Sequence, residues 1–207
     1  MSSFIALISA AALASGEPTA ENLGPGLPSA AAEPAFLVEP IAEKVVDRLP
    51  PGPLYWRVER FPTLSEAKAA ADRYALAAES WGQAWLFTLG ADEGVRSGGQ
   101  KLAEIGPVPA PAARKYLLRI NRAGGPPGAR TPVHTHPGSE AFYVLKGELT
   151  QHIGHGAARV TAGNAMNGHA PGMVMQLESS GTEPLQQLVL FVVDADKPFS
   201  SPAQFGQ

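Results

Sequence analysis

Three side chains that could hold a metal ion lie close together in the 207-residue chain. His134 and His136 are two residues apart, and Glu140 follows four residues later. Because residues two apart in a strand point to the same face, both imidazoles can converge on one point. Pro137 and Gly138 then turn the chain and bring the carboxylate to the start of the next strand. Two imidazoles and a carboxylate match the ligands of non-haem iron and of many manganese and zinc sites.

Other kinds of catalytic site find no support in the sequence. The chain has no cysteine, which excludes zinc–thiolate sites and thiol nucleophiles. It has no Gly-x-Ser-x-Gly elbow, no phosphate loop, and no Gly-x-Gly-x-x-Gly fingerprint after a strand. A metal bound here would have nitrogen and oxygen ligands, so we expect Fe, Mn, Ni, Cu or Zn.

The same stretch resembles the first motif of the cupin superfamily. That motif places a glycine, two histidines, a glutamate and a second glycine at fixed spacing, and Gly128, His134, His136, Glu140 and Gly147 match every fixed position. The resemblance covers roughly residues 86–193. It implies a small antiparallel jelly-roll barrel with the metal inside.

The second cupin motif is matched less well. Gly163 begins it and Gly172 ends its turn, but Met175 stands where the resemblance leads us to expect a histidine ligand. His169 is the nearest imidazole, and we include it in the predicted ligand set with the three residues of the first motif. The alternatives are three protein ligands with water, a site that has lost its metal, or ligation by the soft thioether of Met175, which would suit Cu(I).

Residues that orient a ligand are harder to select, because barrel strands place only alternate side chains inward. Phe142 shares the parity of Glu140, whereas Tyr143 has the other, and a bulge near the turn could invert the two. We predict Tyr143, Arg119 and Gln176 as substrate-binding candidates.

The elements around these residues are typical of an all-β protein. From residue 116 to residue 193, short apolar runs alternate with Gly, Asn or Pro turns, which predicts a sandwich or barrel. His152 and His155 flank the tip of a predicted hairpin, where surface exposure is expected. Together with this pattern, the cupin resemblance implies an all-β fold, an antiparallel jelly-roll (cupin) β-barrel with an N-terminal extension that contains one α-helix.

One α-helix is predicted before the barrel. Thr63 can cap its first turn, Glu66 has the capping-box spacing, and an alanine-rich stretch continues to Glu79. We predict a helix at about residues 63–79 that packs one apolar face on a sheet. The predicted parts are a signal segment and linker (1–34), an N-terminal extension with this helix (35–82), the cupin barrel (83–195) and a C-terminal tail (196–207).

The N-terminal segment favours export. Phe4 to Leu13 is an apolar run followed by small residues, as in a secretory signal, although no positive charge precedes it. We predict a periplasmic or secreted protein, with a cytoplasmic location as the alternative. The run is too short to span a membrane.

Composition limits the partners. The net charge is -3 and no basic patch is apparent, so a nucleic-acid partner has no electrostatic support. The expected partner is a small-molecule ligand or substrate, and the cupin resemblance implies a homodimer.

Three functions fit these observations. The first is a metal-dependent enzyme on a small organic molecule, most simply an oxygenase, with isomerase or lyase chemistry as an alternative on the same ligands. The second is a non-enzymatic module that binds or senses a small ligand. The third is an interaction protein whose working surface is residues 35–99.

Overall fold

The computed structural model describes residues 34–91 and 97–206, which form fourteen strands and one helix. The helix is α1 (Leu64–Ala70). The strands are β1 (Leu37–Val46), β2 (Leu54–Phe61), β3 (Ala75–Ser80), β4 (Gln83–Gly90), β5 (Gln100–Val108), β6 (Tyr116–Gly125), β7 (His134–Thr135), β8 (Gly138–Lys146), β9 (Glu148–Ile153), β10 (Gly156–Thr161), β11 (Ala165–Asn167), β12 (Met175–Ser179), β13 (Leu185–Asp194) and β14 (Ser201–Pro202).

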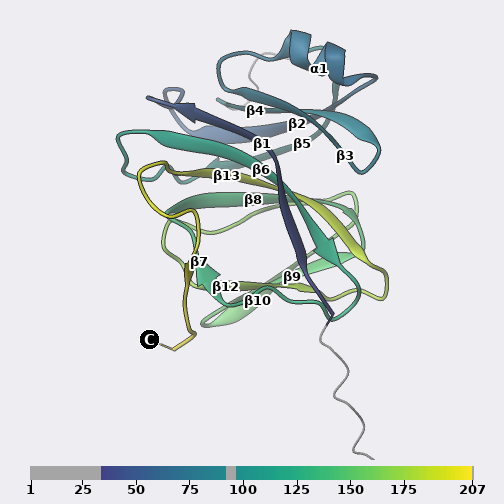
Figure 1. The fold of residues 1–207 in the computed structure, drawn as a ribbon, viewed down its shortest axis with the longest axis vertical. Helices are drawn as coiled ribbons and strands as arrows, with labels where there is room; N and C mark the ends of the chain where they lie inside the picture. Colours follow the sequence, from purple (N-terminus) through teal and green to yellow (C-terminus); the bar gives the residue numbers. More distant parts are fainter. Residues whose placement is uncertain (1–33, 92–96, 207) are drawn as a thin grey trace, which may run out of the picture. The chain divides into compact units, whose positions relative to one another are not determined.

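These strands form three layers (Figure 1). One sheet has the order β1-β6-β13-β8-β11, and a second has the order β10-β9-β12-β7-β14. These two sheets face each other as the jelly-roll barrel. The third sheet, β3-β4-β2-β5, carries α1 and covers the outer face of the first sheet. All named strand pairs are antiparallel, so the predicted all-β fold with an N-terminal extension is confirmed.

The middle sheet presents different side chains to its two neighbours, because alternate residues point to opposite faces. On β8, Glu140 lies in the barrel wall and Phe142 packs in the barrel interior. Tyr143 packs with the extension instead. The turn at Pro137 and Gly138 does not invert this order.

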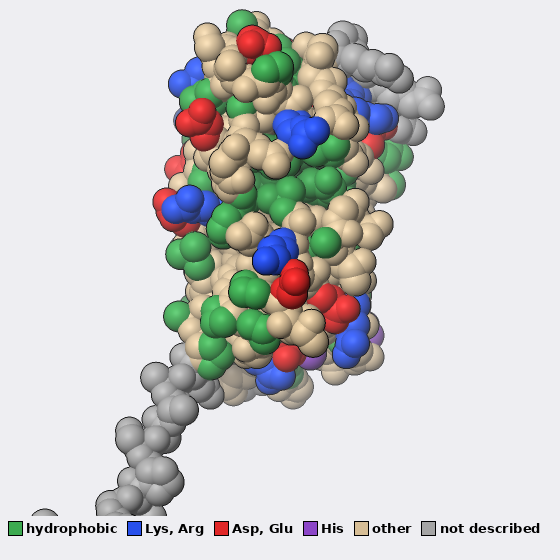
Figure 2. Space-filling model, turned by 90° about the vertical axis from the view of Figure 1, so that its right-hand side faces the viewer, with side chains coloured by type: hydrophobic (Ala, Val, Ile, Leu, Met, Phe, Trp, Pro, Cys, Tyr) green, Lys and Arg blue, Asp and Glu red, His purple; other side chains and the backbone are tan. Residues whose placement is uncertain are grey.

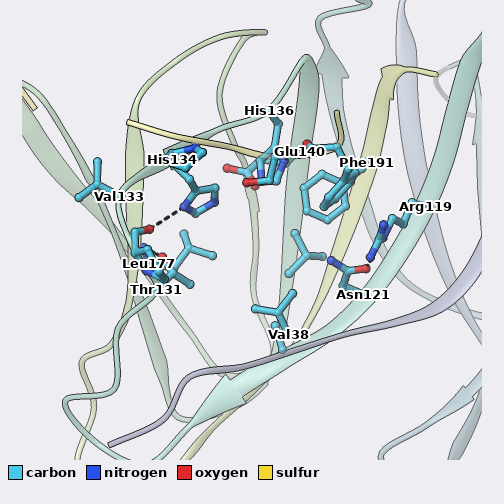
Figure 3. Close-up of a pocket in the computed structure, with 16 residues that line it drawn as sticks. Val38, Arg119, Asn121, Thr131, Val133, His134, His136, Glu140, Leu177 and Phe191 are labelled. Carbon is cyan, nitrogen blue, oxygen red and sulfur yellow. Dashed lines mark hydrogen bonds between the residues drawn. The ribbon is translucent and has the colours of Figure 1, made fainter. Parts of the chain in front are cut away.

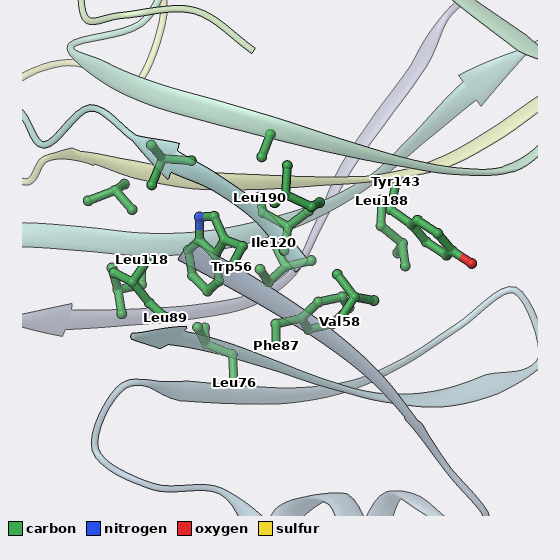
Figure 4. Close-up of a cluster of buried hydrophobic side chains, with 14 of the residues drawn as sticks. Trp56, Val58, Leu76, Phe87, Leu89, Leu118, Ile120, Tyr143, Leu188 and Leu190 are labelled. Carbon is green, nitrogen blue, oxygen red and sulfur yellow. The ribbon is translucent and has the colours of Figure 1, made fainter. Parts of the chain in front are cut away.

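A large apolar core fills the space between the extension and the middle sheet (Figure 4). Trp56 and Phe87 of the extension are fully buried there, together with Leu118, Ile120 and Leu190 of the barrel. Burying one such side chain contributes about 1.5–3 kcal/mol. The extension therefore covers an apolar face that the barrel alone would expose to water.

The surface in Figure 2 shows the same layering from one side. Hydrophobic side chains gather in a band between the upper layer and the barrel, where the interlayer core reaches the surface. Acidic and basic side chains are interspersed on this face.

The predicted helix is confirmed at its start and wrong at its end. Thr63 is the N-cap and accepts a hydrogen bond from the backbone N–H of Glu66 at 3.2 Å. The helix ends at Ala70, however, and Asp72 turns the chain by accepting a bond from the N–H of Tyr74. Residues 75–80 then form β3 beside β4. Pairing with an apolar neighbour outweighs the helix propensity of alanine, because tertiary packing overrides intrinsic propensity.

Sheet pairing also places the segments differently from the predicted boundaries. Residues 37–46 form an edge strand of the barrel, although we assigned them to the extension. Residues 83–90 and 100–108 pair with β2 in the extension sheet, although we assigned them to the barrel. The predicted tail adds a short barrel strand, β14.

Two further observations concern the ends of the chain and the membrane. The apolar run of the predicted signal segment lies outside the described residues. Within the described part of the chain, no helix has the length and hydropathy needed to cross a bilayer.

Candidate functional site

The barrel encloses a cavity of about 400 Å³. Most of its wall is apolar, with Leu177, Val189 and Phe191 among the residues that line it. Val38 of β1 and Pro202 of β14 also line it, and both are exposed. Because β1 and β14 are the edges of the two barrel sheets, the cavity opens to solvent between them.

The three predicted ligands of the first motif lie together on one side of this cavity (Figure 3). His134 lies in β7, His136 follows it, and Glu140 begins the inward face of β8. The two imidazole rings have centroids 4.9 Å apart and cross at 83°.

Each imidazole is fixed by a backbone carbonyl. His134 Nδ1 lies 2.7 Å from the Pro132 oxygen, and His136 Nδ1 lies 2.7 Å from the Phe199 oxygen. A carbonyl oxygen only accepts, so each Nδ1 carries a proton, and in the neutral imidazole Nε2 then has the lone pair. Metal-binding histidines commonly have this arrangement, because the outer hydrogen bond fixes the tautomer and orients the ring.

Burial keeps His136 neutral. Its ring packs between Phe191 and Phe199, with centroids 4.9 Å and 4.7 Å away. Desolvation by these neighbours lowers the pKa of His136 to about 4, although the hydrogen bond to the Phe199 carbonyl acts in the other direction. At neutral pH the side chain is therefore an imidazole able to donate a lone pair.

Glu140 is almost completely buried, with 2% of its surface exposed. Its Oε1 accepts a hydrogen bond from Gln151 Nε2 at 2.7 Å, while its Oε2 has no hydrogen-bond partner in the structure. Burial raises the pKa of this carboxyl to about 8, even though the bond from Gln151 lowers it. A buried carboxyl oxygen without a partner is costly unless a proton or a cation occupies it.

Met175 lies beside this group, in agreement with its place in the second motif. It pairs with His134 across β12 and β7, and it is buried. Its sulfur accepts a second contact from Gln151 Nε2 at 3.4 Å. One amide therefore connects the thioether with the carboxyl of Glu140.

His169 is not among the residues that line the cavity, and its place in the ligand set stays a prediction. The N–H of the preceding Gly168 bonds to the Glu140 carbonyl, so the backbone passes the site closely. The His169 side chain does not line the cavity. Burial and then the charge of His155 lower its pKa, which places it toward the β9–β10 hairpin.

The donor atoms are of the types that bind transition metals, but they do not converge on one point. In the described part of the chain, no three His, Asp or Glu side chains are close enough together to hold one ion. The lone pairs of the two imidazoles and the unpartnered Glu140 oxygen fit such an ion in type.

Arg119 is a cation in the cavity wall, opposite the three donors (Figure 3). It is 18% exposed, donates from Nε to Asn121 Oδ1 at 2.9 Å, and pairs through Nη1 with Glu43 at 2.9 Å. Its guanidinium carbon lies 4.0 Å from the centre of the Phe199 ring. These contacts hold the charge beside the apolar cavity, so Arg119 can contact a ligand there.

Tyr143 and Gln176 are not among the residues that line the cavity, and their roles in substrate binding stay predictions. Tyr143 has the opposite parity to Glu140 and packs edge-on against Trp85 in the interlayer core, 6.4 Å between ring centroids. Gln176 alternates with the buried Met175 and donates to the Thr131 carbonyl at 2.9 Å.

Sequence reasoning missed Gln151, Asn121 and Phe199. Gln151 lies in a predicted strand, but the parity of that strand was unknown. Phe199 lies in a segment predicted to be a tail, and only a long-range contact brings it to His136. No local pattern in the sequence distinguishes these residues.

The two-sheet antiparallel barrel with two histidines and a glutamate on its inner wall defines a double-stranded β-helix with a metal-type site. Residues 124–191 match the family model described as the cupin domain. The predicted resemblance is thus confirmed, and residues 124–191 form a cupin domain.

Parts of the chain are similar to parts of several solved structures. A protein with a double-stranded β-helix domain from Klebsiella pneumoniae is 26% identical, with 42% of this chain and 75% of that chain covered and a TM-score of 0.36. The DMSP lyase from Ruegeria pomeroyi is 24% identical over 44% and 45% of the two chains, with a TM-score of 0.37. An oxalate oxidase in complex with glycolate is 25% identical over 41% and 45%, with a TM-score of 0.34. No curated protein sequence matched the chain.

Proposed function

We propose that this protein is a metal-dependent cupin that binds a small organic anion and transforms it, with oxygenase chemistry as the first reaction to test. His134, His136 and Glu140 would hold a divalent transition metal. The observation that carries the proposal is the pair of imidazoles whose Nδ1 atoms are both bonded to carbonyls, beside the buried Glu140 oxygen without a partner.

The types of ligand atom limit which metals are expected at this site. Nitrogen and oxygen donors suit Fe, Mn, Ni, Cu or Zn, and the nearby sulfur of Met175 adds an option for copper. When bound, such an ion supplies Lewis acidity and, if it is redox-active, electrons for oxygen chemistry.

The charges around the cavity favour an anionic ligand. A dication and Arg119 would face the carboxylates of Glu140 and Glu43, which leaves positive charge in excess. The apolar wall keeps the effective dielectric low, so a ligand carboxylate gains more from these charges than it would in water. Arg119 would hold that carboxylate, and the apolar wall would exclude water from the rest of the ligand.

The proposal is tested by metal analysis of protein purified without added metal, followed by titration of the metal-free protein with Fe(II), Mn(II) and Zn(II). We expect about one ion per chain, and loss of that ion in His134→Ala. His155→Ala is the matched control, because this histidine is exposed on the hairpin. Equal metal content in the two variants would contradict the proposed site.

Turnover is the second part of the test. Metal-loaded protein is screened with small carboxylates, with and without oxygen, while product and oxygen consumption are followed. Arg119→Ala is expected to weaken binding of the active carboxylate, with metal content retained. Iron-loaded protein that consumes oxygen only with substrate would support an oxygenase, whereas turnover without oxygen would support an isomerase or lyase.

A binding or sensing protein is the second candidate. Met175 at the expected position of a histidine ligand, together with donors that are not closed around an ion, favours this alternative. A carboxylate that raises the melting temperature and is recovered unchanged would support it.

A further inference from the structure

The segment after β13 folds back across the opening of the barrel cavity. We call residues 197–203 the C-terminal strap. Ser201 and Pro202 form β14 beside β7, and the N–H of Ala203 donates to the Val133 carbonyl at 3.1 Å. The strap lies outside the residues 124–191 that match the cupin model.

Phe199 connects the strap directly to the proposed metal site. Its carbonyl accepts the bond from His136 Nδ1, and its ring packs against His136 and Phe191. The guanidinium of Arg119 also packs against the Phe199 ring. One residue of the strap thus contacts both a proposed ligand and the proposed anion-binding side chain.

The backbone carbonyl and the aromatic ring have separate consequences. The carbonyl determines which nitrogen of His136 carries the proton, so it keeps Nε2 free for a metal. The ring determines the direction of the His136 plane and covers the guanidinium. Other contacts of the strap are sparse, because β14 has two residues and both are exposed.

We propose that the C-terminal strap is a positioning element for His136, acting through the Phe199 carbonyl. The strap holds the imidazole in the metal-binding tautomer before any metal arrives. The effect on metal affinity rests on the proposed function, whereas the effect on the tautomer does not.

The first experiment uses metal-free protein and long-range proton–nitrogen NMR of the histidine rings. In the wild type we expect His136 to be the Nδ1–H tautomer. In a chain that ends at Asp196, we expect a mixture of the two tautomers. Ala203→Pro, which removes the N–H that donates to the Val133 carbonyl, is expected to give an intermediate mixture. An unchanged His136 spectrum in the folded truncated chain would overturn the proposal.

The second experiment separates the carbonyl from the ring through Co(II) binding. Phe199→Ala keeps the carbonyl, so we expect it to bind Co(II) more tightly than the truncated chain does. The truncated chain is expected to bind about 10- to 100-fold more weakly than the wild type, as for other lost outer hydrogen bonds. Phe205→Ala is the control, because this aromatic lies in the same C-terminal region and does not line the cavity.

Circular dichroism shows whether the truncated chain folds. If it does not fold, the full-length Ala203→Pro variant tests the proposal instead. Wild-type affinity in Ala203→Pro together with an unchanged tautomer would overturn the proposal. If wild-type protein binds no metal at all, the proposed function fails, and the tautomer measurement alone then decides the role of the strap.

Discussion

The two faces of the middle sheet differ in the kind of side chain that they bury. The face toward the extension packs Trp56, Phe87 and Leu190 in a continuous apolar core. The barrel face carries the buried carboxyl of Glu140, with one oxygen unpartnered, and opens on a cavity. Both faces come from the same strands, because side chains alternate. One face thus contributes stability, and the other keeps groups available for a ligand.

The largest expected effect tests the interlayer face. Trp56→Ala is expected to lower the free energy of unfolding by about 3–5 kcal/mol, because it leaves a large cavity in a close-packed core. Denaturant unfolding of metal-free protein measures this. Val45→Ala is the control on the exposed edge strand, where 58% of the side chain is exposed, and we expect a change within about 0.5 kcal/mol.

The opposite face is tested by the dependence of stability on pH. In metal-free protein, burial raises the folded pKa of Glu140 to about 8, above the ordinary glutamate pKa of 4.5. The folded state therefore holds the proton more tightly, and stability falls as the pH rises from 4.5 to 8. Glu140→Gln is expected to remove this fall, which amounts to at most about 3 kcal/mol at pH 7.

His136 acts in the opposite direction at low pH. Its folded pKa of about 4 lies below 6.5, so the unfolded state takes up its proton first and stability falls as the pH drops from 6.5 to 4. An unfolding series from pH 4 to pH 8 separates the two groups. A Glu140→Gln curve parallel to the wild type above pH 5 would contradict the assignment of the carboxyl.

Metal binding is expected to stabilise the protein through the cavity face of the middle sheet only. At a free metal concentration 100 times the dissociation constant, we expect about 2.7 kcal/mol of stabilisation. The gain should vanish in His134→Ala and persist in Trp56→Ala, because only the first changes the cavity face. Melting curves with and without Zn(II) measure both.

The smallest expected effect concerns Tyr143. Because its ring packs between the layers, Tyr143→Phe is expected to leave metal and carboxylate binding unchanged. Titration of the two proteins with the same metal and carboxylate checks this. A loss of carboxylate affinity would show that the tyrosine reaches the cavity after all.

The fold class and the residues of the first motif could be predicted from the sequence alone. The spacing of His134, His136 and Glu140 is local, and strand geometry brings such residues together once the turn at Pro137 forms. The N-cap at Thr63 is local as well, and the structure confirms it. The end of that helix could not be predicted from local sequence, because the pairing of β3 with β4 competes with the helix propensity of alanine.

Tertiary structure decided which side chains reach the cavity. The alternation of side chains along β8 did not show whether Phe142 or Tyr143 faces the barrel interior. The packing of the extension on one face of β8 decided this. Register across β12 and β7 placed Met175 beside the site, whereas His169 is not among the residues that line the cavity. Phe199 reaches His136 from 63 residues away, through backbone atoms that no side-chain pattern reveals. Residue types and short spacings therefore determined the chemistry that this protein can offer, whereas contacts distant in sequence decided which residues share the site.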